Sequence, residues 1–146
     1  MTWALVMDAK QQVESLTNDL LEFAKKMLAE HGEFHPFGGY LKSSAQMVNV
    51  GVKPSSSNES AQNKVGVLIG EFKRLTNEAI AFGIVTDVKL PRDDGSKGDA
   101  VQIFLEHKSG YCADVFFRYE LTANRHVEIT DTIAQRGDPL FFAAMH

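Results

Sequence analysis

Two acidic residues and a histidine near one predicted hairpin could do acid–base chemistry. Glu106 and His107 are adjacent, and Asp114 follows in the next predicted strand. An acid that orients a histidine is a common general-base arrangement. Adjacent strand residues point to opposite faces of a sheet, however, so Glu106 and His107 cannot meet across their own backbone. We therefore expect His107 to be structural, at the edge of the core and bonded to a backbone carbonyl.

The two acidic residues lie diagonally across this hairpin, on one face. Glu106 and Asp114 are within reach of a shared cation or a shared proton, and the simpler interpretation is a solvated pair. Cys112 lies between them in space, where negative charge raises a thiol pKa and opposes nucleophilic use. Cys112 is also the only cysteine, which excludes an internal disulfide and a paired-cysteine redox site. A reducing compartment is the consistent expectation.

A second segment, Glu33 to Tyr40, concentrates aromatic, histidine, proline and glycine residues directly after a predicted helix. The structural interpretation is that Pro36 sets the entry angle and that the glycines permit a bulge in the first strand. The functional interpretation makes His35 a proton carrier or ligand, which requires a second group nearby. Five residues then form a candidate pocket: His35, Phe37, Tyr40, His107 and Tyr111.

Neither a metal site nor a cofactor site is expected from the motifs. The glycines near residue 38 lack the strand, helix and Lys-Ser/Thr of a phosphate-binding loop. The acidic residues from Asp93 to Asp99 miss the ligand spacing of a calcium loop. No serine lies in a nucleophile elbow. We expect no catalytic residue, and an enzyme is the less favoured interpretation.

The register of the hairpin at residues 101–117 can be read from sequence. With a three-residue loop and Gly110 left-handed, Leu105 faces Ala113 and Ile103 faces Val115. That face is apolar throughout. The opposite face mixes charged and aromatic side chains, which is typical of a contact surface. We take it as a candidate interaction face, comprising Gln102, Phe104, Glu106, Asp114, Phe116 and Arg118. Either a second subunit or the apolar segment from Leu140 to Met145 is expected to cover it.

The remaining elements follow from hydrophobic periodicity. A helix is predicted from Asp8 to His31, ended by Gly32, and a second is predicted from a cap at Ser57 or Asn58 through Ile80. Gly66 and Gly70 within the second helix suggest close packing on the sheet. Strands are predicted at 34–41, 47–52, 84–90 and 126–133, with a long mobile connection at 92–98.

These elements give the order α-β-β-α-β-β-β-β in a single domain over residues 1–146. The short connections between strands predict an antiparallel sheet of five to six strands in an α+β fold. We expect both helices to cover one face, the apolar face of the hairpin. The same element order occurs in cystatin-like and NTF2-like domains.

Composition excludes some partners. The formal net charge is −4 and the chain has no run of Lys or Arg, so nucleic acid is not an expected partner. The apolar opening, residues 1–7, is too short to span a bilayer and lacks the basic start of a secretory signal. We expect no membrane association and a cytoplasmic location.

Two motifs suggest a resemblance to known proteins: Glu-Phe-His-Pro-Phe-Gly-Gly at 33–39 and Glu-His-Lys-Ser-Gly-Tyr at 106–111. The chain resembles small uncharacterised bacterial α+β proteins, and loosely immunity proteins. That resemblance implies a protein partner, for which the acidic charge suits a basic molecule. We therefore expect a non-catalytic binding or interaction domain that is of the immunity type or self-associates as a homodimer through the sheet face. The alternative is a small-molecule or enzymatic site between sheet and helices.

Overall fold

The computed structural model describes residues 8–51 and 60–142. These residues form a six-stranded antiparallel sheet and two helices, in the order that the sequence predicts. The α+β class is therefore confirmed. The elements are α1 (Ala9–His31), β1 (Phe37–Lys42), β2 (Met47–Gly51), α2 (Ala61–Lys73), β3 (Ala79–Pro91), β4 (Lys97–His107), β5 (Cys112–Leu121) and β6 (Val127–Arg136).

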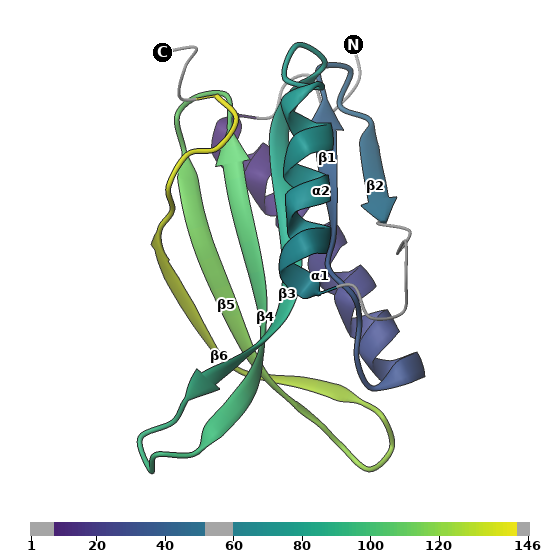
Figure 1. The fold of residues 1–146 in the computed structure, drawn as a ribbon, viewed down its shortest axis with the longest axis vertical. Coiled ribbons are helices and arrows are strands. Elements are labelled where there is room, and N and C mark those ends of the chain that lie inside the picture. Colours follow the sequence, from purple (N-terminus) through teal and green to yellow (C-terminus); the bar gives the residue numbers. More distant parts are fainter. Residues whose placement is uncertain (1–7, 52–59, 143–146) are drawn as a thin grey trace.

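The sheet has the strand order β2-β1-β3-β4-β5-β6 and lies between the two helices, with α2 in front and α1 behind (Figure 1). The expectation that both helices share one face is wrong. Along β3, Ala81 and Val85 pack in the cluster that contains α1, whereas Phe82 and Ile84 pack in the cluster that contains α2. Because alternate strand residues point to opposite faces, the helices cover opposite sides of the sheet. We call these sides the α1 face and the α2 face.

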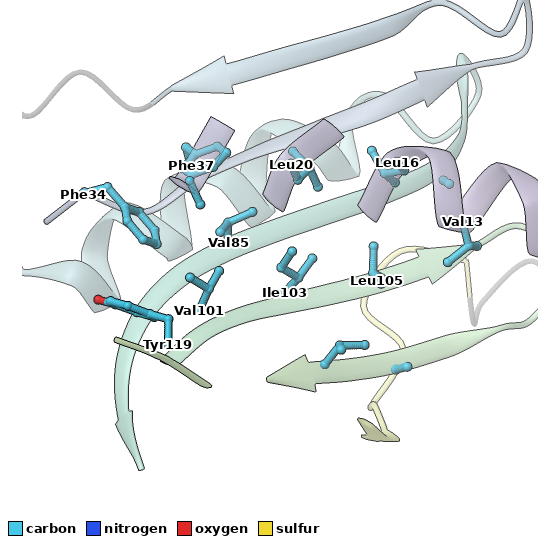
Figure 2. Close-up of a cluster of buried hydrophobic side chains, with 14 of the residues drawn as sticks. Val13, Leu16, Leu20, Phe34, Phe37, Val85, Val101, Ile103, Leu105 and Tyr119 are labelled. Carbon is cyan, nitrogen blue, oxygen red and sulfur yellow. The ribbon is translucent and has the colours of Figure 1, made fainter. Parts of the chain in front are cut away.

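The main core lies on the α1 face, where α1 crosses the central strands. Asp8 caps the start of α1 with a capping box, and Gly32 ends it in the left-handed conformation, as predicted. The buried stripe of α1 packs on the inward side chains of β1, β3 and β4 (Figure 2). The central residues of this core are Leu16, Leu20, Val85, Val101, Ile103 and Leu105.

A second, aromatic cluster lies on the α2 face. Leu68 and Phe72 of α2 pack over Tyr40 and Phe82, and the rings of Phe72 and Phe82 stack with their centroids 4.9 Å apart. Both faces of β1 and of the first half of β3, residues 79–85, are therefore largely buried. The prediction of a single covered face failed because these two strands are apolar on both sides, and periodicity cannot choose between two apolar faces.

Helix α2 is shorter than its sequence pattern suggests. It begins after an N-cap at Ser60 and ends at Lys73, not at Ile80. Leu75 and Ala79 continue the helical spacing, but Ala79 is already in β3, paired with Lys42 of β1. Ladder hydrogen bonds to the neighbouring strand outweigh the local helical pattern here. Ser57 and Asn58, the caps suggested by sequence, lie outside the described residues.

Two further expectations about local structure are wrong. Gly66 and Gly70 are exposed, and a Cβ added at either position meets no atom within 4 Å. They do not bring α2 close to the sheet. The connection expected at 92–98 is a tight turn, because Lys97 already begins β4 and the N–H of Arg92 donates to the carbonyl of Ser96. Asp94 accepts hydrogen bonds from Ser96 within this turn.

The register of the β4–β5 hairpin agrees with the sequence. Val101 pairs with Phe117, Ile103 with Val115 and Leu105 with Ala113. Gly110 has φ 106°, as the turn requires. On the edge strand a bulge near Tyr119 turns Ile133 to the α2 face, where it pairs with Phe116.

None of the described helices is long and apolar enough to cross a membrane.

Candidate functional site

The candidate interaction face is one continuous surface in the structure, and half of it is covered. The hairpin register puts its six residues on the α2 face. Helix α2 lies over β1 and β3, and the C-terminal segment returns over the end of β4, which leaves β5 and β6 uncovered on this side (Figure 1). The predicted intramolecular cover by the C-terminal segment is present from Leu140 to Phe142; residues 143–145 lie outside the described part of the chain.

A groove of about 390 Å³ runs between α2, the strands and the C-terminal segment. We call it the α2 groove. Its apolar lining is built from the inner side of α2, from β3 and β4 and from one tail residue: Val65, Ile69, Ile84, Val88, Phe104 and Leu140. The polar residues in the lining are Gln62, Thr86, Asp87, Gln102 and Asp114. The Asp87 carboxylate accepts a hydrogen bond from Tyr119 on the α1 face, so Asp114 is the carboxylate that the groove presents.

A chain of side-chain hydrogen bonds crosses the floor of the groove from β3 to β5. Thr86 Oγ1 donates to Gln102 Oε1 over 3.4 Å, and Gln102 Nε2 donates to Asp114 Oδ1 over 3.2 Å. This chain fixes the position of the Asp114 carboxylate. Among the described residues no Lys, Arg or His forms an ion pair with it. The groove therefore presents an anionic group on an apolar background.

Glu106, an acid–base candidate in the sequence, binds the backbone of the C-terminal segment. Its side chain is buried, with 2% of its surface exposed. Three consecutive backbone N–H groups, of Leu140, Phe141 and Phe142, donate to its carboxylate at 2.6, 3.0 and 2.7 Å. Its oxygens thus accept from the chain itself. The interpretation of Glu106 and Asp114 as a solvated pair is wrong, because Glu106 is buried under the C-terminal segment.

His107 also has a structural position, on the α1 face. Its Nδ1 accepts from the N–H of Ser109 and its Nε2 lies 2.7 Å from Gln12 Oε1. Nε2 therefore carries the proton and donates to Gln12, a side-chain amide in place of the backbone carbonyl that we expected. Burial lowers the pKa of His107, consistent with a neutral ring. His107 also lines a hollow of about 520 Å³, but both of its ring nitrogens are already hydrogen-bonded and neither is free to bind a ligand there.

The five residues of the candidate pocket do not line one cavity. Phe37 belongs to the cluster on the α1 face, Tyr40 to the aromatic cluster on the α2 face, and Tyr111 is exposed at the hairpin turn. His35 is exposed before β1, where its Nδ1 lies 2.9 Å from Nζ of the buried Lys64. Lys64 is thus the second group that the functional interpretation of His35 requires, and the pair also ties α2 to the segment before β1.

Cys112 is poorly suited to covalent chemistry. Burial and the neighbouring carboxylates Glu106, Asp114 and Asp138 raise the pKa of its thiol to about 12. A thiolate is therefore scarce at neutral pH. The described residues contain no group of three or more His, Cys, Asp or Glu side chains arranged to hold a metal ion.

Sequence reasoning found one wall of the α2 groove and missed the other. Gln102, Phe104 and Asp114 follow from the hairpin register. Val65 and Ile69 were visible as part of a helical stripe, and Leu140 as part of an apolar C-terminal run, but nothing local says which face they cover.

A scan against protein-family models and searches of curated proteins and of solved structures each found no match. The similarity of element order to cystatin-like and NTF2-like domains stays a prediction.

Proposed function

We propose that this protein is a non-catalytic binding module that holds a segment of a partner protein in the α2 groove. The observation that carries the proposal is the Asp114 carboxylate, held by Gln102 in an apolar groove and without an ion-pair partner among the described residues. A partly desolvated carboxylate binds a cation more strongly than an exposed one does. The segment that fits is therefore apolar with a lysine or arginine beside its apolar residues.

The surroundings of the groove favour a protein segment over a small ligand. Beyond Asp114 the same face continues along β5 and β6 to Phe116, which is half-buried, and to Ile133, which is 37% exposed. Apolar side chains next to a groove provide contact area that a small molecule in the groove does not reach. The net charge of −4 also suits a basic partner. These features support the immunity-type interaction suggested by the sequence.

The positions of the ionisable side chains support a role without catalysis. Glu106 is engaged by three backbone N–H groups, both nitrogens of His107 are hydrogen-bonded, and Cys112 has a raised pKa. A catalytic acid, base or nucleophile needs a free atom that can reach a substrate. Of the acidic and nucleophilic side chains considered in the sequence, Asp114 is the one that lines the groove.

The proposal is tested by selecting peptides from a phage-displayed library of random dodecamers against the full chain. We expect the selected peptides to carry a basic residue beside apolar ones. In spectra of labelled protein, they should shift the backbone amide signals of α2, β4 and β5 residues around the groove. Asp114→Asn should weaken binding by about tenfold or more, since it removes one buried charge–charge contact. Asp19→Asn, the same substitution at an exposed carboxylate of α1 on the other side of the sheet, is the matched control and should leave binding unchanged.

Three outcomes contradict the proposal. The first is that no peptide is selected, and the second is that the selected peptides lack basic residues or shift signals outside the groove. The third is that benzylamine, a small cation with an apolar body, binds the groove as tightly as the peptides do. That result would favour the small-molecule alternative. Self-association through the sheet face would appear as amide shifts that depend on protein concentration without any peptide.

A further inference from the structure

One end of the α2 groove is closed by residues 137–142, which we call the strap. The strap follows β6 and returns across the end of β4 (Figure 1). Its start is fixed, because Gly137 is buried and its N–H donates to the carbonyl of Cys112 over 3.1 Å. Asp138, Pro139 and Leu140 are exposed, and Leu140 lines the groove.

The backbone of the strap is held by one side chain, while the rings of Phe141 and Phe142 pack in the aromatic cluster. Among the described residues, no backbone–backbone hydrogen bond involves residues 138–142. The N–H groups of Leu140, Phe141 and Phe142 all converge on the Glu106 carboxylate. Strands of the sheet, by contrast, are held by ladders of many bonds along their length. The strap can therefore detach by losing the Glu106 hydrogen bonds and the packing of Phe141 and Phe142, without breaking any strand pairing.

The side chains under the strap form an apolar seat that continues the groove. Phe141 packs on Phe82 with ring centroids 4.6 Å apart and contacts Phe104 at 6.3 Å, and Phe142 packs on Phe82 at 5.5 Å. Phe104 lines the groove as well. When the strap is lifted, Phe104 therefore joins the groove to the newly exposed ring of Phe82.

We propose that the strap opens as a unit while the rest of the domain stays folded, and that a partner segment in the α2 groove extends over Phe82 when it does. The second half of this inference rests on the proposed binding function; the first does not. The strap is then a lid on the aromatic end of the site, and Glu106 is the residue that keeps it closed.

Native-state hydrogen exchange of the full chain without any ligand tests the opening. We expect the Leu140, Phe141 and Phe142 amides to exchange together, faster than β3 and β4 amides, and with a smaller urea dependence than those amides, because opening the strap exposes less surface than global unfolding does. In Glu106→Gln an amide NH₂ replaces one acceptor oxygen. Exchange of the three strap amides should then accelerate by about tenfold or more, while β3 and β4 amides keep their rates. Glu128→Gln is the control.

The proposal is overturned if the strap amides of the unmodified chain exchange only with the global unfolding of β3 and β4 and with the same urea dependence. That measurement needs no variant, so it decides the matter even if Glu106→Gln fails to fold. It is also independent of the peptide selection. If the strap opens but no peptide binds the α2 groove, the binding proposal fails and the strap proposal stands. If peptides bind but the strap opens only with global unfolding, the strap proposal fails and the binding proposal stands.

Discussion

Asp87 and Tyr119 form a hydrogen bond on the α1 face that links β3 to β5 across β4. The hydroxyl of Tyr119 donates to Asp87 Oδ1 over 2.9 Å. Burial is the main cause that raises the pKa of Asp87, and nearby Asp99 and Glu33 raise it further, while the Tyr119 hydrogen bond opposes them. Burial and the Asp87 charge raise the pKa of Tyr119 as well. The pair therefore retains an ionised carboxylate in a place that disfavours its charge.

The stability of the Asp87→Asn variant tests this interpretation through its pH dependence. A carboxyl whose folded pKa lies above its ordinary value of 3.8 destabilises the fold while it is ionised. Asparagine keeps an acceptor for Tyr119 and does not ionise. We therefore expect Asp87→Asn to be at least as stable as the parent at pH 7. Its advantage should shrink as the pH falls through the folded pKa and disappear below 3.8.

Urea unfolding of both proteins between pH 3 and pH 8 measures this difference. Glu128→Gln, which removes an exposed carboxylate from β6, is the control and should show no such change. If Asp87→Asn were less stable than the parent at pH 7 and equal to it at pH 3, the ionised carboxylate would be stabilising and the interpretation would be wrong.

At the scale of elements, the placement of α2 makes the candidate site. It covers β1 and β3 on the face opposite to α1, and its inner edge supplies one wall of the α2 groove. Its outer surface is open: Val67 is 47% exposed, and a Cβ added at Gly66 or Gly70 would meet no atom within 4 Å. Glycine in a helix interior costs stability without a compensating contact at these positions.

Alanine at Gly66 or Gly70 should therefore stabilise the protein by about 0.5 to 1 kcal/mol each. Gly38→Ala in β1 is the informative contrast, because an added Cβ there would lie 2.6 Å from the backbone oxygen of Gly83. We expect it to destabilise by about 1 to 3 kcal/mol, the usual cost of overpacking. Denaturant midpoints measure all three. A lower midpoint for Gly66→Ala or Gly70→Ala would mean that α2 is more closely packed than the structure shows.

At the scale of the whole molecule, the chain covers part of its own candidate interaction face. Phe104 is half-buried, and its ring lies 6.3 Å from that of Phe141, while Phe116 and Ile133 stay open on the neighbouring strands. The cover of Phe104 is thus intramolecular, and it does not require a second subunit.

Phe104→Glu should consequently cost stability at every protein concentration, by about 2 kcal/mol or more. The substitution removes aromatic packing and sets a carboxylate directly opposite Asp114 in the strand register. Unfolding midpoints at two concentrations a hundredfold apart, together with sedimentation velocity, measure the effect. Phe104→Leu is the apolar control and should lose less stability than Phe104→Glu. A loss seen only at high concentration would indicate cover by a second copy, and no loss would show that Phe104 lies on plain surface.

The sequence by itself determined the features that depend on neighbours along the chain. Asp8 and Gly32 delimit α1 through local capping, and Gly110 with the alternation of residues 101–117 specifies the hairpin register. That register places Gln102, Phe104 and Asp114 on one face, which is half of the candidate site. These outcomes follow from side-chain period and turn geometry, which act within a few residues.

Tertiary structure alone decided the rest. Ala79 to Val85 is apolar on both sides, so its pattern suits a helix on either face, and only the competition for buried area assigns α1 and α2 to opposite ones. The function of Glu106 was equally hidden, because its partners, the N–H groups of residues 140–142, are distant in sequence and carry no side-chain signal. Backbone donors are the same in every residue except proline, so no sequence pattern marks the ones that a buried carboxylate will bind.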